Sequence, residues 1–518
     1  MVFGQRQLAG PRLPPAKGSA THLVVLCHGY GADGNDLISL APHWQRFLPT
    51  AAFVAPNASN KTIFLVVLIL AGFVEGIILV ATPAMVRDFS PQLGRGTAMG
   101  FWTLGPVVGS LVVAAVASNT LPANLGANPN AWKGQFITAG VSGLVVFAIA
   151  LLFLRELSPG LRDQLMVSSR DRVLIEARAA NIDVEGSLKK PWRQVLHLDV
   201  IGSAFAISVF LLIYFAAVGF FVVYFTTTFG FTEKQANGIG NWFWAFDAGA
   251  LIVIGLLSDR FRVRKPFMVI GAVGAVVMTI VFASRTGHPA TGYYTFVWVI
   301  TLMAVFLGIA YAPWMASFTE TVEKRNPALT ATGLAVWGWI IRVVVAVSIF
   351  VLPYVVSSTT PLVNYGTQVK TALVAVEKAP PVSVPYASTP QPLLSVVTSH
   401  ATLFGELSKY KTASAIPPAL LGTAVHDVGV PALLEANSFK APLAVLSAHG
   451  AQVTAAAKVT PSQWKHWWWV CVAGELLFIP LIFVMVGRWS PARARRDVEA
   501  YERMVDDELA KLRGAAVT

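Results

Sequence analysis

Long apolar stretches constrain this chain more than any other feature of its sequence. A bilayer core is crossed by a helix of about 20 apolar residues. Segments of this kind lie at 62–86, 97–118, 134–154, 199–225, 237–257, 266–284, 292–317, 328–356 and 466–487. Only 13% of the residues are charged, against about 25% in an average soluble domain. The sequence therefore predicts an all-α membrane protein, a polytopic helical bundle of about nine transmembrane helices.

The loops between these stretches alternate between basic and nearly neutral. Basic residues gather in 155–198, in 258–265 and after residue 487, whereas the loops 119–133, 226–236 and 285–291 are poor in them. The positive-inside rule places basic loops in the cytoplasm. We therefore expect a multi-pass protein of the plasma (inner) membrane with a cytoplasmic C-terminus. The net charge of +12 arises largely from these loops, so we expect the lipid bilayer as a partner and no nucleic acid.

Four ionisable residues interrupt the predicted spans: Glu75, Asp247, Arg342 and Glu475. A charge at the bilayer centre costs at least about 2.5–3.5 kcal/mol, so such residues usually face a bundle interior or a water-filled path. We interpret all four as candidates for substrate binding or coupling. Glu75 and Asp247 are candidate carriers of a coupled proton, with a helix-packing role as the alternative.

The guanidinium of Arg342 can donate two parallel hydrogen bonds to a carboxylate or phosphate. This slightly favours small organic anions as the expected substrate. An ion pair with Glu475 or Asp247 is the alternative reading. Glu475 follows the aromatic segment 466–469, which is typical of a membrane interface, so we expect it to be less deep than the others. Aromatic pairs on three spans line a substrate cavity or serve as packing anchors: Trp242 and Trp244, Tyr311 and Trp314, Trp337 and Trp339.

The sharpest motif is the short basic turn Gly255-Leu-Leu-Ser-Asp259-Arg260-Phe-Arg262-Val-Arg264-Lys265. Its glycine permits close helix approach, and Asp259 is placed to cap the following turn or to pair with a basic neighbour. The turn resembles the loop between the second and third helices of each half of the major facilitator superfamily, in its second-half copy.

Two further stretches resemble the same family. Residues 83–96 look like the link between its fourth and fifth helices. Gly105, Pro106 and Gly109 resemble the core of its fifth-helix glycine–proline motif, which is associated with antiporters. Ser110 and Phe101 stand where that motif has glycine, so the match leaves symport and antiport open.

The resemblance covers residues 61–355 and 466–495 and lacks the first three helices of the family. It implies secondary active transport of a small solute, which we expect to be proton-coupled, by alternating access of two halves. It implies neither an enzyme nor a cofactor. Because part of the first half is missing, a second chain is an expected partner to complete the bundle. Cys27 and Cys471 lie far apart and indicate neither a disulfide framework nor a metal site.

Residues 21–58 differ from the rest of the chain. A buried strand, a glycine-rich turn at His28–Gly34, an amphipathic helix and a second short strand are predicted there. This pattern resembles the start of the phospholipase/carboxylesterase family of α/β-hydrolases. No complete Gly-x-Ser-x-Gly elbow follows, and a serine hydrolase needs nucleophile, base and acid together. A membrane-anchored hydrolase is thus the alternative function, and we expect no esterase activity.

The predicted domain organisation follows from these assignments. A hydrolase-like fragment (1–60) precedes a partial N-terminal transporter half (61–155), a cytoplasmic central loop (156–198) and a C-terminal half (199–356). An extracytoplasmic insertion (357–465) precedes the last span (466–487) and a basic cytoplasmic tail (488–518), in which Asp497–Arg513 reads as an amphipathic helix.

Overall fold

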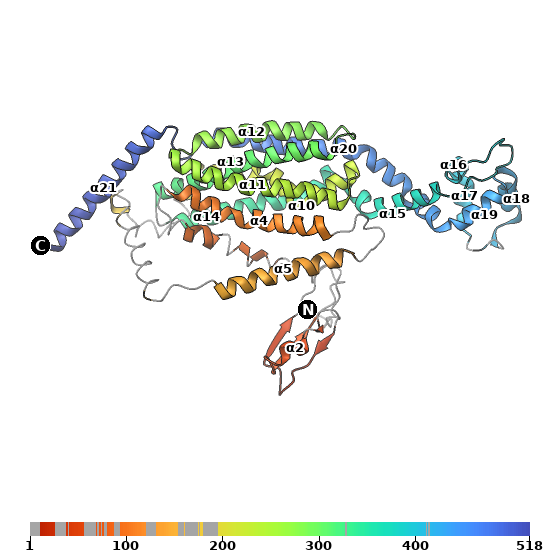
Figure 1. Ribbon diagram of the computed structural model, residues 1–518, viewed down its shortest axis with the longest axis horizontal. Helices are drawn as coiled ribbons and strands as arrows, with labels where there is room; N and C mark the ends of the chain where they lie inside the picture. Colours follow the sequence, from red (N-terminus) through yellow and green to blue (C-terminus); the bar gives the residue numbers. More distant parts are fainter. Residues whose placement is uncertain are drawn as a thin grey trace, which may run out of the picture.

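The structure, a computed structural model, describes residues 11–25, 38–39, 41–55, 69, 72–73, 75–76, 80–86, 94–120, 131–153, 160, 175, 177–179, 195–326, 329–410, 412 and 415–517. Helices dominate this part of the chain (Figure 1). The glycine-rich turn at 28–34, Cys27 and most of the central loop 156–198 lie outside the described residues.

Among the described residues, 6 helical segments are long and apolar enough to cross a membrane. They are α4 (Arg95–Thr120), α9 and α10 taken together (Leu198–Phe210 and Leu212–Phe229), α11 (Glu233–Phe261), α12 (Lys265–Arg285), α13 (Tyr293–Arg325) and α14 (Thr330–Val355). These segments confirm the predicted all-α membrane protein. Two other predicted spans correspond to α5 (Ala131–Phe153) and to the end of α20 (Lys440–Ile482). Only parts of 62–86 are described, and those parts are helical, so the total of nine spans stays a prediction.

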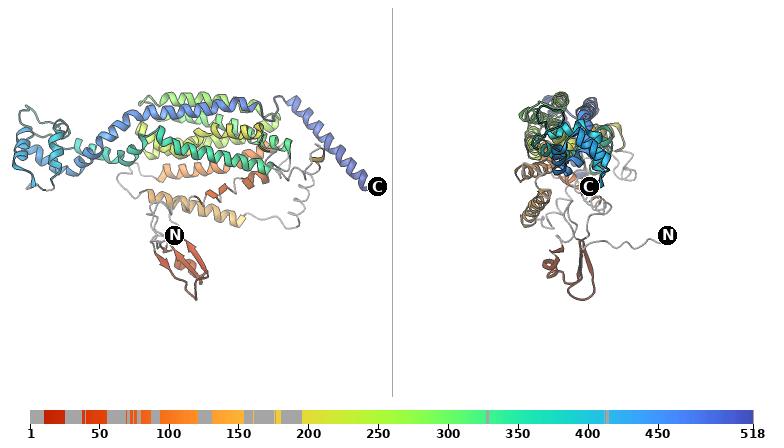
Figure 2. Two further views of the ribbon diagram at one scale, coloured as in Figure 1. Left: turned by 180° about the vertical axis from the view of Figure 1, so that it is seen from behind. Right: turned by 90° about the vertical axis from the view of Figure 1, so that its right-hand side faces the viewer.

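The helices lie side by side with their long axes roughly parallel (Figure 2). Their ends carry local signals. Thr232 and Gln235 form a reciprocal capping box at the start of α11, and α10 ends at Gly230 with φ 68°. Such caps satisfy backbone groups that a helix end leaves without partners. Membrane helices pack closely where small residues meet, and Gly271 on α12 lies directly against the backbone of Ala310 on α13.

The insertion 357–465 is folded and helical. It contains α15 (Thr359–Glu377), α16 (Leu393–Ser399), α17 (Ala401–Ser408), α18 (Pro418–Asp427), α19 (Val430–Ser438) and the first part of α20. Val376, Leu393, Val396, Val428 and Ala432 form a small core of its own, separate from that of the bundle. The insertion projects from one end of the bundle, and the terminal helix α21 (Pro491–Val517) leaves the other end (Figure 1).

The N-terminal piece forms a small sheet. Strands β1 (Arg12–Leu13), β3 (Ala51–Val54) and β2 (His22–Val25) are ordered β1-β3-β2, with β2 parallel and β1 antiparallel to β3. The short helix α2 (Ala41–Gln45) packs its Ala41 on the core that contains Ala51 and Phe53. The predicted strands and helix are therefore present, and the resemblance to hydrolases stays a prediction.

Candidate functional site

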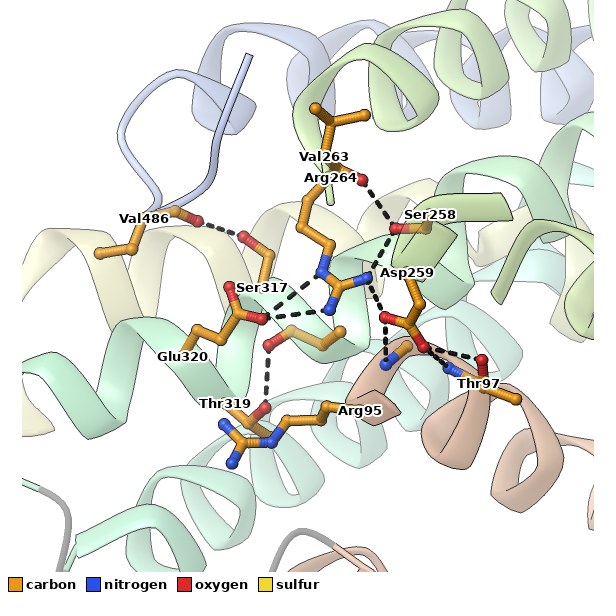
Figure 3. A network of polar contacts seen from close by, with 12 residues as sticks. Arg95, Thr97, Ser258, Asp259, Val263, Arg264, Ser317, Thr319, Glu320 and Val486 are labelled. Carbon is orange, nitrogen blue, oxygen red and sulfur yellow. Dashed lines mark hydrogen bonds and ion pairs between the residues drawn. The ribbon is translucent and has the colours of Figure 1, made fainter. Parts of the chain in front are cut away.

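A polar network surrounds the turn between α11 and α12 and ties this turn to α4 (Figure 3). The carboxylate of Asp259 accepts hydrogen bonds from the backbone N–H groups of Gly96 (3.1 Å) and Thr97 (2.6 Å) and from the Thr97 hydroxyl (2.7 Å). These N–H groups belong to the first turn of α4, where donors lack partners within the helix. Asp259, at the end of α11, therefore caps α4. A negative charge at a helix N-terminus is also favoured by the helix dipole.

Arg264 holds Asp259 in this position. Its Nη1 donates to Asp259 Oδ1 and to the Ser258 hydroxyl, both at 2.7 Å, and its Nη2 lies 3.3 Å from Glu320 Oε1 on α13. Burial lowers the pKa of Arg264, but the carboxylates of Glu320 and Asp259 outweigh it and raise the pKa above its ordinary value. The guanidinium therefore stays charged. The sequence left open whether Asp259 pairs with a basic neighbour, and this pairing is confirmed.

Two more ion pairs lie at this end of the bundle. Arg95, at the start of α4, pairs with Glu323 near the end of α13, and both side chains are buried. Arg325 Nη2 lies 2.8 Å from Asp199 Oδ2 at the start of α9. The first of these pairs joins α4 to α13. Breaking a buried pair typically costs about 3–5 kcal/mol because a buried charge is left alone.

Gly255 brings α11 close to α4. A Cβ at this position would lie 2.9 Å from the carbonyl oxygen of Gly96. Only glycine leaves that space, and the approach brings Asp259 within reach of the first turn of α4.

The other basic residues of the motif have different surroundings. Arg260 is exposed. Lys265 is buried, donates to the carbonyl of Phe483 (3.2 Å) and lies 5.8 Å from the ring centre of Trp489. Lys265 thus joins α12 to the segment after α20.

Asp247 lies on α11, inside the bundle. It is 4% exposed. Tyr214 on α10 and Tyr311 on α13 lie close enough to interact with it electrostatically. Its Oδ1 also faces Gly308 on α13, where an added Cβ would lie 3.0 Å away. Across the described residues, Asp247 has no ion pair and its side chain has no hydrogen bond.

The aromatic residues of the predicted pairs divide into two groups. Trp244, Trp314 and Trp337 are buried, whereas Trp242 and Trp339 are exposed. Trp244 meets the ring of Tyr214 edge-on at 5.3 Å between centroids, Tyr311 stacks on Trp314 at 6.0 Å, and Trp337 lies 5.5 Å from Trp314. Tyr214 and Tyr311, the two rings that lie near Asp247, are thus each in contact with one of the buried tryptophans.

Glu475 lies inside the helical bundle. It is fully buried, and its Oε1 accepts a hydrogen bond from the Thr279 hydroxyl on α12 (2.7 Å). Trp464 and Trp468 just before it are buried as well, and its expected depth in the membrane stays a prediction. The side chain joins α20 to α12.

Arg342 does not pair with either candidate carboxylate. Its Nη1 donates to the carbonyl of Gly338, one turn back on α14 (3.0 Å), and the side chain is half-buried. Neither Asp247 nor Glu475 lies within ion-pair distance of it in the described part of the chain. The ion-pair alternative was therefore wrong. Glu75 is exposed, so the structure does not bring the four candidates together.

The glycine–proline segment of α4 faces outward. Gly105, Pro106 and Gly109 are exposed, and an added Cβ at either glycine meets no described atom within 4 Å. The helix continues through Pro106. This face of α4 therefore packs against no described helix.

Sequence reasoning missed Arg95, Thr97, Glu320 and Glu323 as parts of the polar network. One local signal pointed to two of them. Glu320 and Glu323 stand three residues apart just after the predicted span 292–317, a spacing that places both on one face if the helix continues. The backbone N–H groups of Gly96 and Thr97 carry no sequence signal at all.

Comparison with known families gives one match. A family model described as Major Facilitator Superfamily matches residues 47–344, more than half of the 518 residues. The match begins within the N-terminal piece and ends inside α14. It includes α4, the polar network, Asp247 and Arg342.

Proposed function

The chain belongs to the major facilitator superfamily, whose members are membrane transporters, and on this basis we propose that it moves a small solute by proton-coupled secondary transport. The polar network carries this proposal. It connects the N-terminal half to the C-terminal half through Asp259, Arg264 and Arg95 at the end of the bundle that also bears α21. Alternating access requires two halves that rock about a central site, and breakable polar links at one end suit such a motion. We place this end in the cytoplasm of a plasma-membrane protein.

Asp247 is the best candidate for the proton carrier. A buried carboxylate inside a membrane bundle marks an ion or proton path by default. Asp247 is buried, and its helix α11 lies within the residues that the family model matches. Glu475 and Glu75 are weaker candidates, because Glu475 is hydrogen-bonded between two helices and Glu75 is exposed.

The test of the proposal is gradient-driven uptake. We expect Asp247→Asn to lower acid-driven uptake into membrane vesicles at least tenfold, since the amide cannot carry the proton. A panel of labelled amines, sugars, amino acids and carboxylates supplies the solute. Glu233→Gln, at the start of the same helix, is the matched control. Full acid-driven uptake by Asp247→Asn would exclude Asp247 as the carrier.

Arg342→Ala is expected to abolish uptake while the protein still reaches the membrane. An arginine at mid-depth is costly to retain without a role, and in the described chain its only hydrogen bond is to its own helix. Uptake and surface expression are measured together. Normal uptake would show that Arg342 is dispensable, whereas loss of expression would assign it a structural role.

We expect the purified chain alone to transport only weakly. The predicted N-terminal half has three spans, and apolar side chains of α4 and α5 such as Phe101, Val113, Leu144 and Phe147 are exposed. We propose that a second chain covers these faces. Uptake into proteoliposomes at low and high protein-to-lipid ratio checks this. Robust uptake at ratios that give one chain per vesicle would contradict it.

A further inference from the structure

The charge around Asp247 is unbalanced within the described chain. Its carboxylate is almost completely buried, and no charged side chain of the described residues forms an ion pair with it. The titratable groups that face it are the phenols of Tyr214 on α10 and Tyr311 on α13. Both tyrosines are half-buried, so the ring cluster is not sealed on every side.

Aromatic faces attract positive charge. A cation within about 6 Å of a ring centre gains roughly 0.5–2 kcal/mol, more when both are out of water, and tryptophan is the best partner. Tyr214 and Tyr311 lie near Asp247. Trp244 contacts Tyr214, and Trp314 stacks on Tyr311 and contacts Trp337. A buried carboxylate that has no counter-ion among the described residues and lies beside two aromatic rings complements a cation and repels an anion.

Resting on the proposed transport function, we propose that the transported solute is an organic cation, an amine or quaternary ammonium compound, which Asp247 neutralises and the surrounding rings enclose. This reverses the slight preference for anions that Arg342 suggested. The Arg342 guanidinium donates to its own helix and leaves the charge of Asp247 uncompensated. The indole N–H groups of Trp314 and Trp337 are buried without an acceptor in the described chain, so a hydroxyl or carbonyl on the solute would find donors here.

Binding of charge-matched probes tests the proposal. Tetraphenylphosphonium and tetraphenylborate share one shape with opposite charge, and choline has a neutral isostere in 3,3-dimethylbutan-1-ol. Equilibrium binding to the purified full-length chain is measured with all four compounds. We expect at least one of the two cations to bind and its partner to fail to compete. Asp247→Asn should weaken cation binding at least tenfold, and Glu233→Gln should leave it unchanged.

A pair of variants at Tyr311 tests the contribution of the aromatic ring separately from that of the Asp247 charge. Tyr311→Leu should weaken cation binding several-fold, whereas Tyr311→Phe should retain it, because the ring face and not the hydroxyl attracts the cation. This pair keeps the proposal testable if Asp247→Asn fails to fold. The proposal would be overturned if neither cation binds or if the protein prefers tetraphenylborate. It would also be overturned if cation binding is unchanged by substitutions at both Asp247 and Tyr311.

The outcomes also separate this inference from transport itself. Asp247-dependent cation binding without gradient-driven uptake would support the inference and contradict the proposed function. Gradient-driven uptake of an anion, with no cation bound, would support the proposed function and contradict the inference.

Discussion

Asp259→Ala is expected to reduce transport at least tenfold and to loosen the start of α4, while the protein remains in the membrane. The substitution removes the acceptor for two backbone N–H groups of α4, a loss of about 0.5–2 kcal/mol for a helix cap. It also takes one of two carboxylates from the buried Arg264, and breaking such a pair costs about 3–5 kcal/mol. A free-energy change of about 1.4 kcal/mol corresponds to a factor of ten in an equilibrium constant. The conformation in which the polar network closes this end of the bundle should therefore lose most of its population.

Hydrogen exchange gives a direct readout of this change. The amides of Gly96 and Thr97 donate to Asp259, so peptides from the start of α4 should exchange faster in Asp259→Ala. Arg260→Ala is the matched control, because Arg260 lies in the same basic turn but is exposed. Exchange and uptake equal to those of the unmodified protein in Asp259→Ala would show that the cap is unimportant.

Gly271→Leu is expected to disrupt the bundle itself. An added Cβ would lie 2.8 Å from Ala310 Cα and from the carbonyl carbon of Ile309, and this backbone cannot move aside as a side chain can. Overpacking typically costs about 1–3 kcal/mol, and more when backbone must shift. At about 2–4 °C per kcal/mol for a large domain, we expect Tm to fall by about 10 °C or the protein to aggregate.

Size-exclusion profiles and thermal unfolding in detergent measure this effect. Gly219→Leu is the control, since a Cβ at Gly219 on α10 meets no described atom within 4 Å. Equal behaviour of the two variants would mean that α12 and α13 do not approach as closely as the structure shows.

Local properties of the chain were predictable from the sequence. Helices cross a membrane when about 20 consecutive residues are apolar, so α4 and α9–α14 could be recognised one at a time. The motif from Gly255 to Lys265 was equally visible, because a turn and its charges lie within a few residues. The cap of α11 by Thr232 and Gln235 is local in the same way.

Depth and partners could not be derived in this way. The tryptophans before Glu475 suggested a membrane interface, yet α20 continues far beyond the bundle and Trp468 packs against Tyr224 and Phe282 at ring distances of 5.1 and 5.0 Å. Whether an aromatic segment lies at an interface or in a core depends on which helices surround it. That information is absent from the segment itself.

The sequence by itself determined that this chain is a helical membrane protein of a transporter family with a conspicuous basic turn. Only the tertiary structure decided what the turn does. Asp259 meets Thr97 across 162 positions of sequence, and Arg95 meets Glu323 across 228. Such contacts arise from the packing of whole helices, in which glycines such as Gly255 let backbones approach, and no local pattern of residues specifies the partner. The same holds for Asp247 on α11, beside which lie Tyr214 of α10 and Tyr311 of α13.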